Sequence, residues 1–232
     1  MTPNQTPEFN GLLLVHKPTG MSSFDVIRRL RRITGFRKIG HAGTLDPAAS
    51  GLMLMLFGPA CKQADRLIKH DKRYLAEITL GQVSTTGDRE GELSPVSDRV
   101  PTREEVAAAL MQLTGEIDQV PPVYSAIKIN GQEAYKRVRK GETVEIPARR
   151  VTIYKNRLMR YEYPLIELDC RVSSGTYIRT LAEDLGRMLG TGAYLSALQR
   201  MEVDEFKLEE ALDLETATPE SIKSHLKSIN AI

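Results

Sequence analysis

The sequence GHAGTLDPAASG, residues 40–51, sets a histidine, a threonine and a single carboxylate among three glycines. Glycine permits backbone conformations that are closed to other residues, and it lets a second molecule approach the main chain closely. The dipeptide Asp46-Pro47 favours a stiff turn. The apolar run that follows, at residues 52–57, is typical of a buried strand. The stretch therefore predicts a loop that presents Asp46 beside a buried strand.

Two interpretations of this loop are open on the residues alone. Asp-Pro is common in turns that only connect two elements, where the carboxylate caps the turn. A functional loop is favoured by the grouping of His41, Thr44 and Asp46 within six residues of one another. Loops held by rigid elements are common places for chemistry, so we treat this loop as a candidate site.

Strands and helices follow one another irregularly along the 232 residues. Residues 74–80 alternate in the manner of a half-buried strand, Ser22 or Ser23 can cap a helix, and Thr102 with Glu105 forms a capping box. We predict strands at 11–15, 52–57, 74–80, 150–161, 165–172 and 195–203, a hairpin at 124–129 turned by Asn130-Gly131, and helices at 24–34, 60–68, 102–113 (closed by Gly115), 133–139 and 177–189. This order favours an α+β domain with a mixed, mostly antiparallel central sheet flanked by helices and loops.

The length allows one large domain or two small ones, and we favour one. We expect a disordered lead-in at 1–10, the domain at 11–205 and a short helical tail at 206–232. Residues 1–10 lack the apolar core of a signal peptide, and no apolar run approaches transmembrane length, so a cytoplasmic protein is expected. Cys61 and Cys170 show no metal-ligand spacing and no disulfide pattern, and we interpret both as reduced and structural.

The formal net charge is only +2, so the bulk charge does not indicate a nucleic-acid partner. Its distribution is more informative, because basic residues cluster while residues 202–220 are acidic. A solvated helix surface is the ordinary interpretation of one charge run, whereas two basic clusters together favour a face for a polyanion. The clusters are Arg28, Arg29, Arg31, Arg32, Arg37 and Lys38, and Lys136, Arg137, Arg139 and Lys140.

The loop resembles the catalytic motif of the TruB family, the bacterial tRNA pseudouridine synthases that isomerise a uridine in the T-loop. Its matching pattern is G-H-x-G-T-L-D-P-x-A-x-G, and so long a fixed pattern is hard to obtain by chance. The resemblance covers about residues 11–205 in the family's order. It continues through K-P-x-G-x-S-S at 17–23, D-K-x-Y at 71–74, T-x-D-x-x-G at 86–91, P-P-x-Y-S-A-x-K at 121–128 and S-G-T-Y-I-R-T at 174–180.

The resemblance implies the pseudouridine synthase fold, a long mixed sheet with helices and loops around an active-site cleft. The reaction breaks the bond from C1′ to N1, rotates the uracil and joins C1′ to C5, with no need for a metal or a redox cofactor. The target uridine is tucked inside the folded T-loop and must be extruded first. The implied partner is the T-arm of tRNA, bound by a monomer.

Four residues match catalytic positions of the family. Asp46 matches the catalytic aspartate, and Arg179 matches the active-site arginine that pairs with it and keeps it ionised against desolvation. Asp88 matches an aspartate that pairs with this arginine. Tyr74 matches the tyrosine that stacks on the flipped uracil and is a candidate for the C5 proton, although a strand tyrosine is more often a core residue. From the residues alone, Arg179 in the first turn of a helix opposes the helix dipole and needs a carboxylate or phosphate partner.

Further positions match substrate contacts. His41 matches the residue that inserts into the T-loop and fills the space left by flipped bases, whereas a histidine outside such a motif is more often structural. The implied pocket residues are Tyr177 and Leu198, and the implied phosphate contacts are Lys17, Lys62 and the cluster between Arg28 and Lys38.

Several points are open. Full-length bacterial members carry a C-terminal RNA-binding PUA domain, and this sequence stops about where that domain would begin, so we expect the catalytic domain without it. The sequence does not decide whether Asp46 attacks C1′, attacks C6 or promotes a glycal intermediate. An RNA chaperone is a competing function, but it would have no use for Asp46, Tyr74 and Arg179 together. A hydrolase using His41 and Asp46 lacks a nucleophile, base and orienting group.

Overall fold

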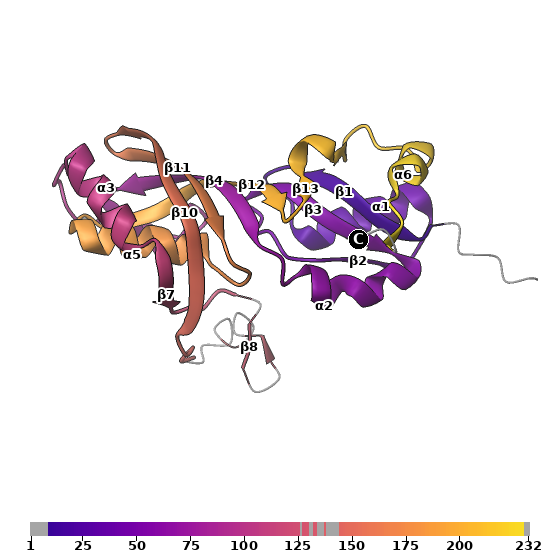
Figure 1. Cartoon of the computed structure of the whole chain (residues 1–232), viewed down its shortest axis with the longest axis horizontal. Coiled ribbons are helices and arrows are strands. Elements are labelled where there is room, and N and C mark those ends of the chain that lie inside the picture. Colours follow the sequence, from indigo (N-terminus) through magenta and orange to yellow (C-terminus); the bar gives the residue numbers. More distant parts are fainter. Residues whose placement is uncertain (1–8, 126, 130–131, 134–136, 138–143, 230–232) are drawn as a thin grey trace, which may run out of the picture. The chain divides into compact units, whose positions relative to one another are not determined.

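The computed structural model describes residues 9–125, 127–129, 132–133, 137 and 144–229 (Figure 1). The chain forms two compact units. The first lies within Met1–Lys72 and Gln199–Ile232, and the second is Arg73–Leu198. Strands β4 (Lys72–Leu80) and β12 (Ala193–Val203) each run from one unit into the other. The predicted division into a domain at 11–205 and a tail stays a prediction.

The first unit is a mixed sheet with helices. Its strand order is β14, β1, β3 and the end of β12, with β2 added to β3 and β13 added to β12. The pairs β1–β3, β2–β3 and β12–β13 are antiparallel, and β1–β14 and β3–β12 are parallel. The elements are β1 (Gly11–Lys17), α1 (Ser23–Thr34), β2 (Ile39–His41), β3 (Ser50–Phe57), the 3₁₀ helix η1 (Gly58–Gln63), α2 (Ala64–Leu67), β13 (Phe206–Lys207), η2 (Leu208–Glu210), β14 (Leu212–Asp213) and α6 (Pro219–His225).

The strand β3 is apolar throughout because both of its faces are covered. Leu52, Leu54 and Leu56 belong to one core cluster with residues of β1, and the intervening Met53 and Met55 are also fully buried. An uninterrupted apolar run is what a strand buried on two sides requires. The antiparallel register pairs Lys17 with Gly51, so the ends of β1 and β3 meet beside the candidate loop.

The helix α1 begins where the sequence predicts. Ser22 caps it, and the side chain of Asp25 accepts a hydrogen bond from the Ser22 backbone in return, which completes a capping box. Gly35 ends the helix in the left-handed conformation at φ 67°. Phe9, which the sequence placed in the lead-in, is buried in an aromatic group with Phe36 and Phe57.

The second unit is a mostly antiparallel sheet. Here β4 lies between the first part of β12 and β11, and β10 and β7 follow in order. The pairs β10–β11 and β10–β7 are antiparallel, and the helices α3 and α5 pack against each other (Figure 1). The elements are β5 (Gln82–Ser84), β6 (Leu93–Pro95), α3 (Arg103–Gln112), β7 (Gly115–Gln119), β8 (Lys128–Ile129), β9 (Gln132–Glu133), β10 (Arg149–Glu162), β11 (Leu165–Val172) and α5 (Ile178–Leu189).

The α+β class and the mostly antiparallel sheet are confirmed in both units. In β4, the predicted alternation holds, with Tyr74, Ala76, Ile78 and Leu80 on the buried side. The predicted hairpin is present as the antiparallel pair β8–β9, while its turn residues lie outside the described residues. So does most of the predicted helix at 133–139, including Lys136, Arg139 and Lys140.

Three expected elements differ from the structure. The helix predicted at 60–68 is a 3₁₀ helix with Pro59 near its start, followed by a single α-helical turn. Gly115 does not close α3, which has Leu113 as its C-cap. It instead opens β7, a strand that the sequence did not predict, at φ 100°. Tyr177 is the N-cap of α5 rather than its first residue.

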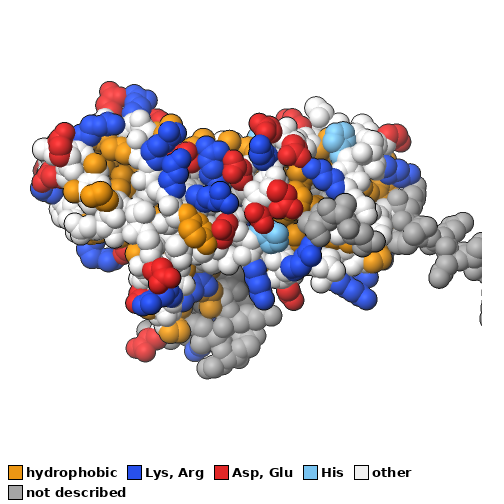
Figure 2. Space-filling view, in the orientation of Figure 1, with side chains coloured by type: hydrophobic (Ala, Val, Ile, Leu, Met, Phe, Trp, Pro, Cys, Tyr) orange, Lys and Arg blue, Asp and Glu red, His pale blue; other side chains and the backbone are white. Residues whose placement is uncertain are grey.

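Charged side chains of both signs are interspersed over the face shown in Figure 2, while apolar ones gather near α3 and α5. Exposed apolar residues of these two helices include Met111 and Met188. Within the described residues, no helix combines the length and the apolar character needed to cross a membrane.

Candidate functional site

The loop that carries Asp46 connects β2 to β3 in the first unit. Its ends are fixed by two backbone hydrogen bonds, from Ala42 N to Leu54 O at 2.9 Å and from Ala49 N to Asp46 O at 3.1 Å. Asp46 is half-buried. Between these two bonds the loop lies outside the sheet, so other groups must define its path.

Arg200, from the end of β12, holds three carbonyl groups of this region. Its Nε donates to Leu52 O at 2.7 Å, and its two terminal nitrogens donate to Gly43 O at 3.1 Å and Thr44 O at 3.4 Å. The side chain is 1% exposed. A guanidinium offers five N–H donors in a rigid fork, so this single buried residue fixes both the loop and the start of β3.

Lys17, the last residue of β1, and Ser23, the first residue of α1, also hold this loop. The ammonium of Lys17 donates to Met21 O at 2.6 Å, Pro18 O at 2.9 Å and Pro47 O at 3.5 Å. Ser23 Oγ donates to Leu45 O at 2.8 Å and accepts from Leu45 N at 2.9 Å. Ser23 is thus a loop contact, and the helix cap is Ser22.

The expected phosphate contact of Lys17 is wrong for this structure. Its side chain is fully buried, at 0% exposure, and its donors point to backbone carbonyls. A buried ammonium is tolerated only where such hydrogen bonds compensate for its lost hydration. Lys17 is therefore a positioning residue for the loop, next to Gly51 in the strand register.

Gly51 is required by close packing against Arg200. A Cβ on Gly51 would lie 2.3 Å from the Arg200 carbonyl oxygen and 2.5 Å from its nitrogen, and the φ of Gly51 is +111°. Other residues avoid this conformation, and no side chain fits in this space. Gly51, at the end of the motif, thus allows β3 and β12 to pair closely next to the carbonyl groups that the Arg200 side chain bonds.

His41 ends β2, at the start of the loop, and is half-buried. Burial, and then the positive charge of Arg200, lower the pKa of its imidazole below 6.5. Its Nδ1 is buried with no hydrogen-bond partner in the described part of the chain. The imidazole is therefore neutral at neutral pH, able to pack against or bond to a nucleobase without bringing a charge.

In the second unit, Arg179 and Asp88 form a buried ion pair. The guanidinium lies 3.5 Å from Asp88 Oδ2, and both side chains are less than a tenth exposed. Arg179 also donates to Thr86 O at 3.0 Å and Tyr124 O at 2.9 Å, while Asp88 Oδ1 accepts from Thr86 Oγ1 at 2.6 Å and Glu90 N at 3.0 Å. The carboxylate partner that Arg179 needs in the first turn of α5 is therefore Asp88.

Glu183 adds a second acidic group one turn along α5. A Cβ on Gly87 would lie 2.6 Å from Glu183 Oε1 and 3.4 Å from Arg179 Cβ, which places all three together. Burial raises the pKa of the Glu183 carboxyl, with Asp184 adding to the rise and Arg179 opposing it. The loop at 86–88 and the start of α5 thus form one charged group around Arg179.

The start of α5 is also tied to β7. Gln119 is fully buried, and its amide bonds reciprocally to the Tyr177 backbone, with Tyr177 N donating to Oε1 at 2.7 Å and Nε2 donating to Tyr177 O at 3.1 Å. The Arg149 guanidinium lies 4.9 Å from the centroid of the Tyr177 ring. The ring is therefore held by its backbone on one side and by a cation–π contact on the other.

The remaining predicted residues have different surroundings. Tyr74 is 8% exposed on β4, Leu198 is half-buried on β12, and Lys62 is exposed in η1. The predicted residues divide between the units, with Lys17, His41, Asp46 and Lys62 in the first and Tyr74, Asp88, Tyr177, Arg179 and Leu198 in the second. The pairing of Asp46 with Arg179 stays a prediction.

Sequence reasoning missed several residues that shape these sites. Ser23 was considered only as a cap, and Arg200, Gln119, Arg149 and Glu183 were not singled out. A lone arginine late in a strand is a weak signal at best, and a glutamine gives none.

Among the described residues, one group could offer metal ligands, with atoms within 4.8 Å of one another: His70, Asp204 and Glu205. His70 Nδ1 is 2.8 Å from Asp204 Oδ2, so these two members of the group contact each other.

Comparison with known proteins relates most of the chain to one family. Residues 31–178 match the model described as TruB family pseudouridylate synthase (N terminal domain), and residues 179–227 match that of the tRNA pseudouridylate synthase B C-terminal domain. Among curated relatives named tRNA pseudouridine synthase B, that of Cupriavidus metallidurans is 47% identical over 90% of this chain and 67% of its own length. That of Opitutus terrae is 44% identical over 90% of this chain and 87% of its own.

Solved structures agree on the fold. A chain of a Cbf5-Nop10-Gar1 complex superposes with a TM-score of 0.71 at 27% identity over 90% of this chain. A chain of an H/ACA RNP bound to a substrate RNA containing 2′-deoxyuridine does so with a TM-score of 0.66 at 25% identity over 88%. The present chain spans 53% and 51% of the length of these two chains.

Proposed function

Because the chain belongs to the TruB family of pseudouridylate synthases, we propose that it isomerises uridine to pseudouridine in tRNA, at uridine 55 of the T-loop. The observation that carries this proposal is the Asp46 loop, which follows the family's pattern and is held by buried Arg200, Lys17 and Ser23. A carboxylate placed on so firmly fixed a backbone suits a reaction that depends on the position of one group.

The reaction is an isomerisation, so its atoms balance within the nucleoside. The C1′–N1 bond breaks, the detached uracil turns, C1′ bonds to C5, the proton leaves C5, and N1 gains a proton. In our proposal the Asp46 carboxylate acts on the nucleoside to detach the base. Tyr74 stacks on the freed uracil and receives the C5 proton.

Arg179 has two tasks in this proposal. It bonds Asp88 and two carbonyls, so its guanidinium is already fixed before RNA binds. A fixed cation favours the ionised form of a carboxylate brought close to it, and we propose that Asp46 benefits in this way. Asp88 orients the arginine and offsets its buried charge.

RNA recognition is the second part of the proposal. The target uridine must leave the folded loop, which costs a few kcal/mol that stacking and backbone contacts must offset. His41 is neutral and half-buried at the start of the loop that carries Asp46, and it suits insertion among the unpaired bases. Tyr177, held by Gln119 and Arg149, and Leu198 suit the lining of the base pocket. We propose a monomer acting in the cytoplasm on the T-arm, with Lys62 among its phosphate contacts.

The test is incubation of the protein with unmodified tRNA transcript, followed by mapping of pseudouridine. We expect the modification at one T-loop uridine, without added metal or cofactor. A protein that binds and refolds tRNA but forms no pseudouridine would be a chaperone and would overturn the proposal.

A T-stem-loop minihelix, tested beside whole tRNA, checks that the T-arm is sufficient. Whole tRNA bound more than about tenfold tighter, a difference of about 1.4 kcal/mol, would require contacts beyond it.

A further inference from the structure

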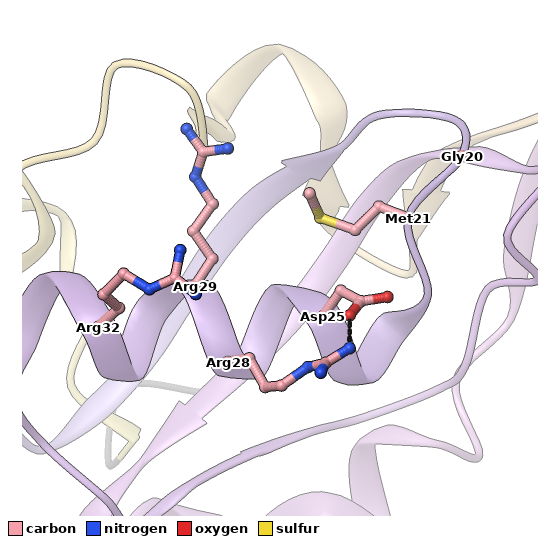
Figure 3. Close-up of a pocket in the computed structure, with 6 residues that line it drawn as sticks. All are labelled: Gly20, Met21, Asp25, Arg28, Arg29 and Arg32. Carbon is pink, nitrogen blue, oxygen red and sulfur yellow. Dashed lines mark hydrogen bonds and ion pairs between the residues drawn. The ribbon is translucent and has the colours of Figure 1, made fainter.

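The exposed side of α1 borders a hollow of about 400 Å³ in the first unit (Figure 3). The residues of α1 that line the hollow are spaced by three or four positions, so they share one face of the helix. Arg29 rises from this face on the side of Met21, whereas Arg28 turns toward Asp25 (Figure 3). The complete lining is Gly20, Met21, Asp25, Arg28, Arg29 and Arg32.

Only part of the positive charge in this hollow is neutralised. Arg28 pairs with Asp25. Arg29 donates to the Glu215 backbone carbonyl at 3.4 Å, which leaves its charge uncompensated. Arg32 makes no hydrogen bond or ion pair within the residues that the structure describes. One carboxylate therefore faces three guanidinium groups.

A purely structural role does not account for this grouping. Cations near the end of a helix are favoured by its dipole, which suits Arg32 but not Arg29 in the middle of α1. Like charges three or four residues apart destabilise a helix slightly, and the face brings Arg28 and Arg29 each close to Arg32. A surface that needed only solubility would be better served by mixed signs.

An exposed aromatic ring adjoins these arginines. Phe24 is 55% exposed, and the Arg28 guanidinium lies 5.6 Å from its centroid. An aromatic face among cations is the combination that binds single-stranded or looped nucleic acid, since cations contact phosphates and rings stack on bases. The chemistry of this face therefore fits RNA better than it fits an isolated small anion.

The hollow is joined to the Asp46 loop within the same unit. Gly20 N donates to Pro47 O at 2.8 Å, and Lys17, which bonds Pro47 O, also bonds Met21 O at 2.6 Å. Two residues of the hollow's rim are thus fixed to the residue that follows Asp46. The rim of the hollow therefore lies next to the loop that carries Asp46.

We propose that the α1 hollow binds a backbone phosphate of the RNA substrate through Arg29 and Arg32, with Arg28 and Phe24 completing the contact surface. This inference rests on the proposed function, and it separates these residues from Arg37 and Lys38 of the same basic cluster. Arg37 and Lys38 are exposed but do not line the hollow.

The matched experiment compares two double variants that each remove two positive charges. Both Arg29→Gln/Arg32→Gln and Arg37→Gln/Lys38→Gln are made in the Asp46→Asn background, and T-stem-loop RNA binding is measured across a salt titration. Each lost phosphate contact lowers the salt slope by about 0.9. We expect the hollow variant to lose about 2 in slope and about tenfold or more in affinity at 0.1 M salt, and the control variant to lose less than threefold.

Equal losses in both variants would show a general effect of net charge and would overturn the proposal, as would unchanged binding in the hollow variant. Thermal unfolding checks that α1 remains folded. Arg29→Lys/Arg32→Lys keeps the charge and should keep most of the slope.

Active protein provides an independent readout. With Asp46 intact, the hollow variant should raise the KM for RNA and leave kcat nearly unchanged. Failure of the wild-type protein to form pseudouridine would refute the proposed function, whereas an active wild type with an unaffected hollow variant would refute this inference alone.

Discussion

The carbonyl oxygen of Arg200 lies 2.3 Å from the point where a Cβ of Gly51 would stand. The same arginine reaches with its side chain to Gly43, Thr44 and Leu52. Its backbone therefore demands a glycine at the end of the loop, while its guanidinium fixes the loop's beginning.

Gly51→Ala should destabilise the protein far more than a glycine replacement at an uncrowded site. Gly35→Ala is the matched control, because Gly35 also has a positive φ but no atom of the described residues within 4 Å of the position of a Cβ. The control should cost about 1 kcal/mol from backbone strain alone. Gly51→Ala should exceed 4 kcal/mol because main-chain atoms cannot move aside cheaply. Urea unfolding measures both, and equal costs would show that β12 yields easily.

Arg200→Met should disorder the Asp46 loop. It removes donors from three carbonyls, at about 1 to 3 kcal/mol for each one left buried and unsatisfied. A loop displaced by about 1 Å can cost about 10²-fold in rate. Removing the Arg200 charge should also raise the His41 pKa toward its ordinary value, which NMR titration measures independently of activity. An unchanged His41 pKa would contradict the proximity on which this prediction depends.

Asp46→Asn should abolish pseudouridine formation while leaving tRNA binding nearly intact. The amide keeps the shape of the side chain but lacks the charge and the nucleophilic oxygen of the carboxylate. Pseudouridine mapping and equilibrium binding on the same preparation separate the two effects. Activity within tenfold of the wild-type rate would refute the catalytic role.

Arg179→Met should leave Asp88 buried without its cation, at a cost of about 3 to 5 kcal/mol, and should lower the rate by several orders of magnitude. Arg179→Lys should restore only part of the activity. One ammonium cannot reproduce the bonds to Asp88, Thr86 and Tyr124 with the arginine's planar fork. Denaturant unfolding and single-turnover kinetics measure the two effects. Full activity of the lysine variant would show that charge alone suffices.

Lys72 should make stability rise with pH in the alkaline range. Burial, and then the charge of Arg200, lower its pKa from 10.5 to about 8. Between these two pKa values Lys72 keeps its proton in the unfolded chain but has released it in the folded chain. The free energy of unfolding therefore increases by up to about 3 kcal/mol as the pH rises through this range, and Lys72 does not change it below pH 8. Burial raises the pKa of the Cys170 thiol to about 12, which acts in the opposite direction above pH 9. The measurement is therefore the wild-type free energy of unfolding minus that of Lys72→Met, and a flat difference would contradict the prediction.

The sequence predicts elements best where the stabilising contacts are local. The capping box of Thr102 and Glu105 and the alternation from Tyr74 to Leu80 depend on neighbours along the chain, and both are confirmed. A cation in the first turn of a helix needs an anion, so the sequence indicated a carboxylate or phosphate partner for Arg179, and the family resemblance indicated Asp88.

The hydrogen bonds by which Arg200 holds the loop could not be anticipated. Arg200 is 157 residues from Gly43 in sequence, and it bonds a backbone carbonyl, a group that every residue has. Such contacts leave no pattern of residue types at either end. For the same reason Lys17 was assigned to phosphate, since a basic residue near a functional motif resembles a surface contact until its burial is known.

Arg200, Lys17 and Ser23 bond main-chain oxygens and one main-chain nitrogen of the loop at 43–47. The shape of the loop is thus independent of the identities of most side chains it displays. Exchanges at positions such as Thr44 and Ala48 can alter what the loop recognises without altering how it is built. The backbone of the loop is held in one conformation while several of its side chains can be exchanged. Protein engineering could use this property to redirect the enzyme to other uridines.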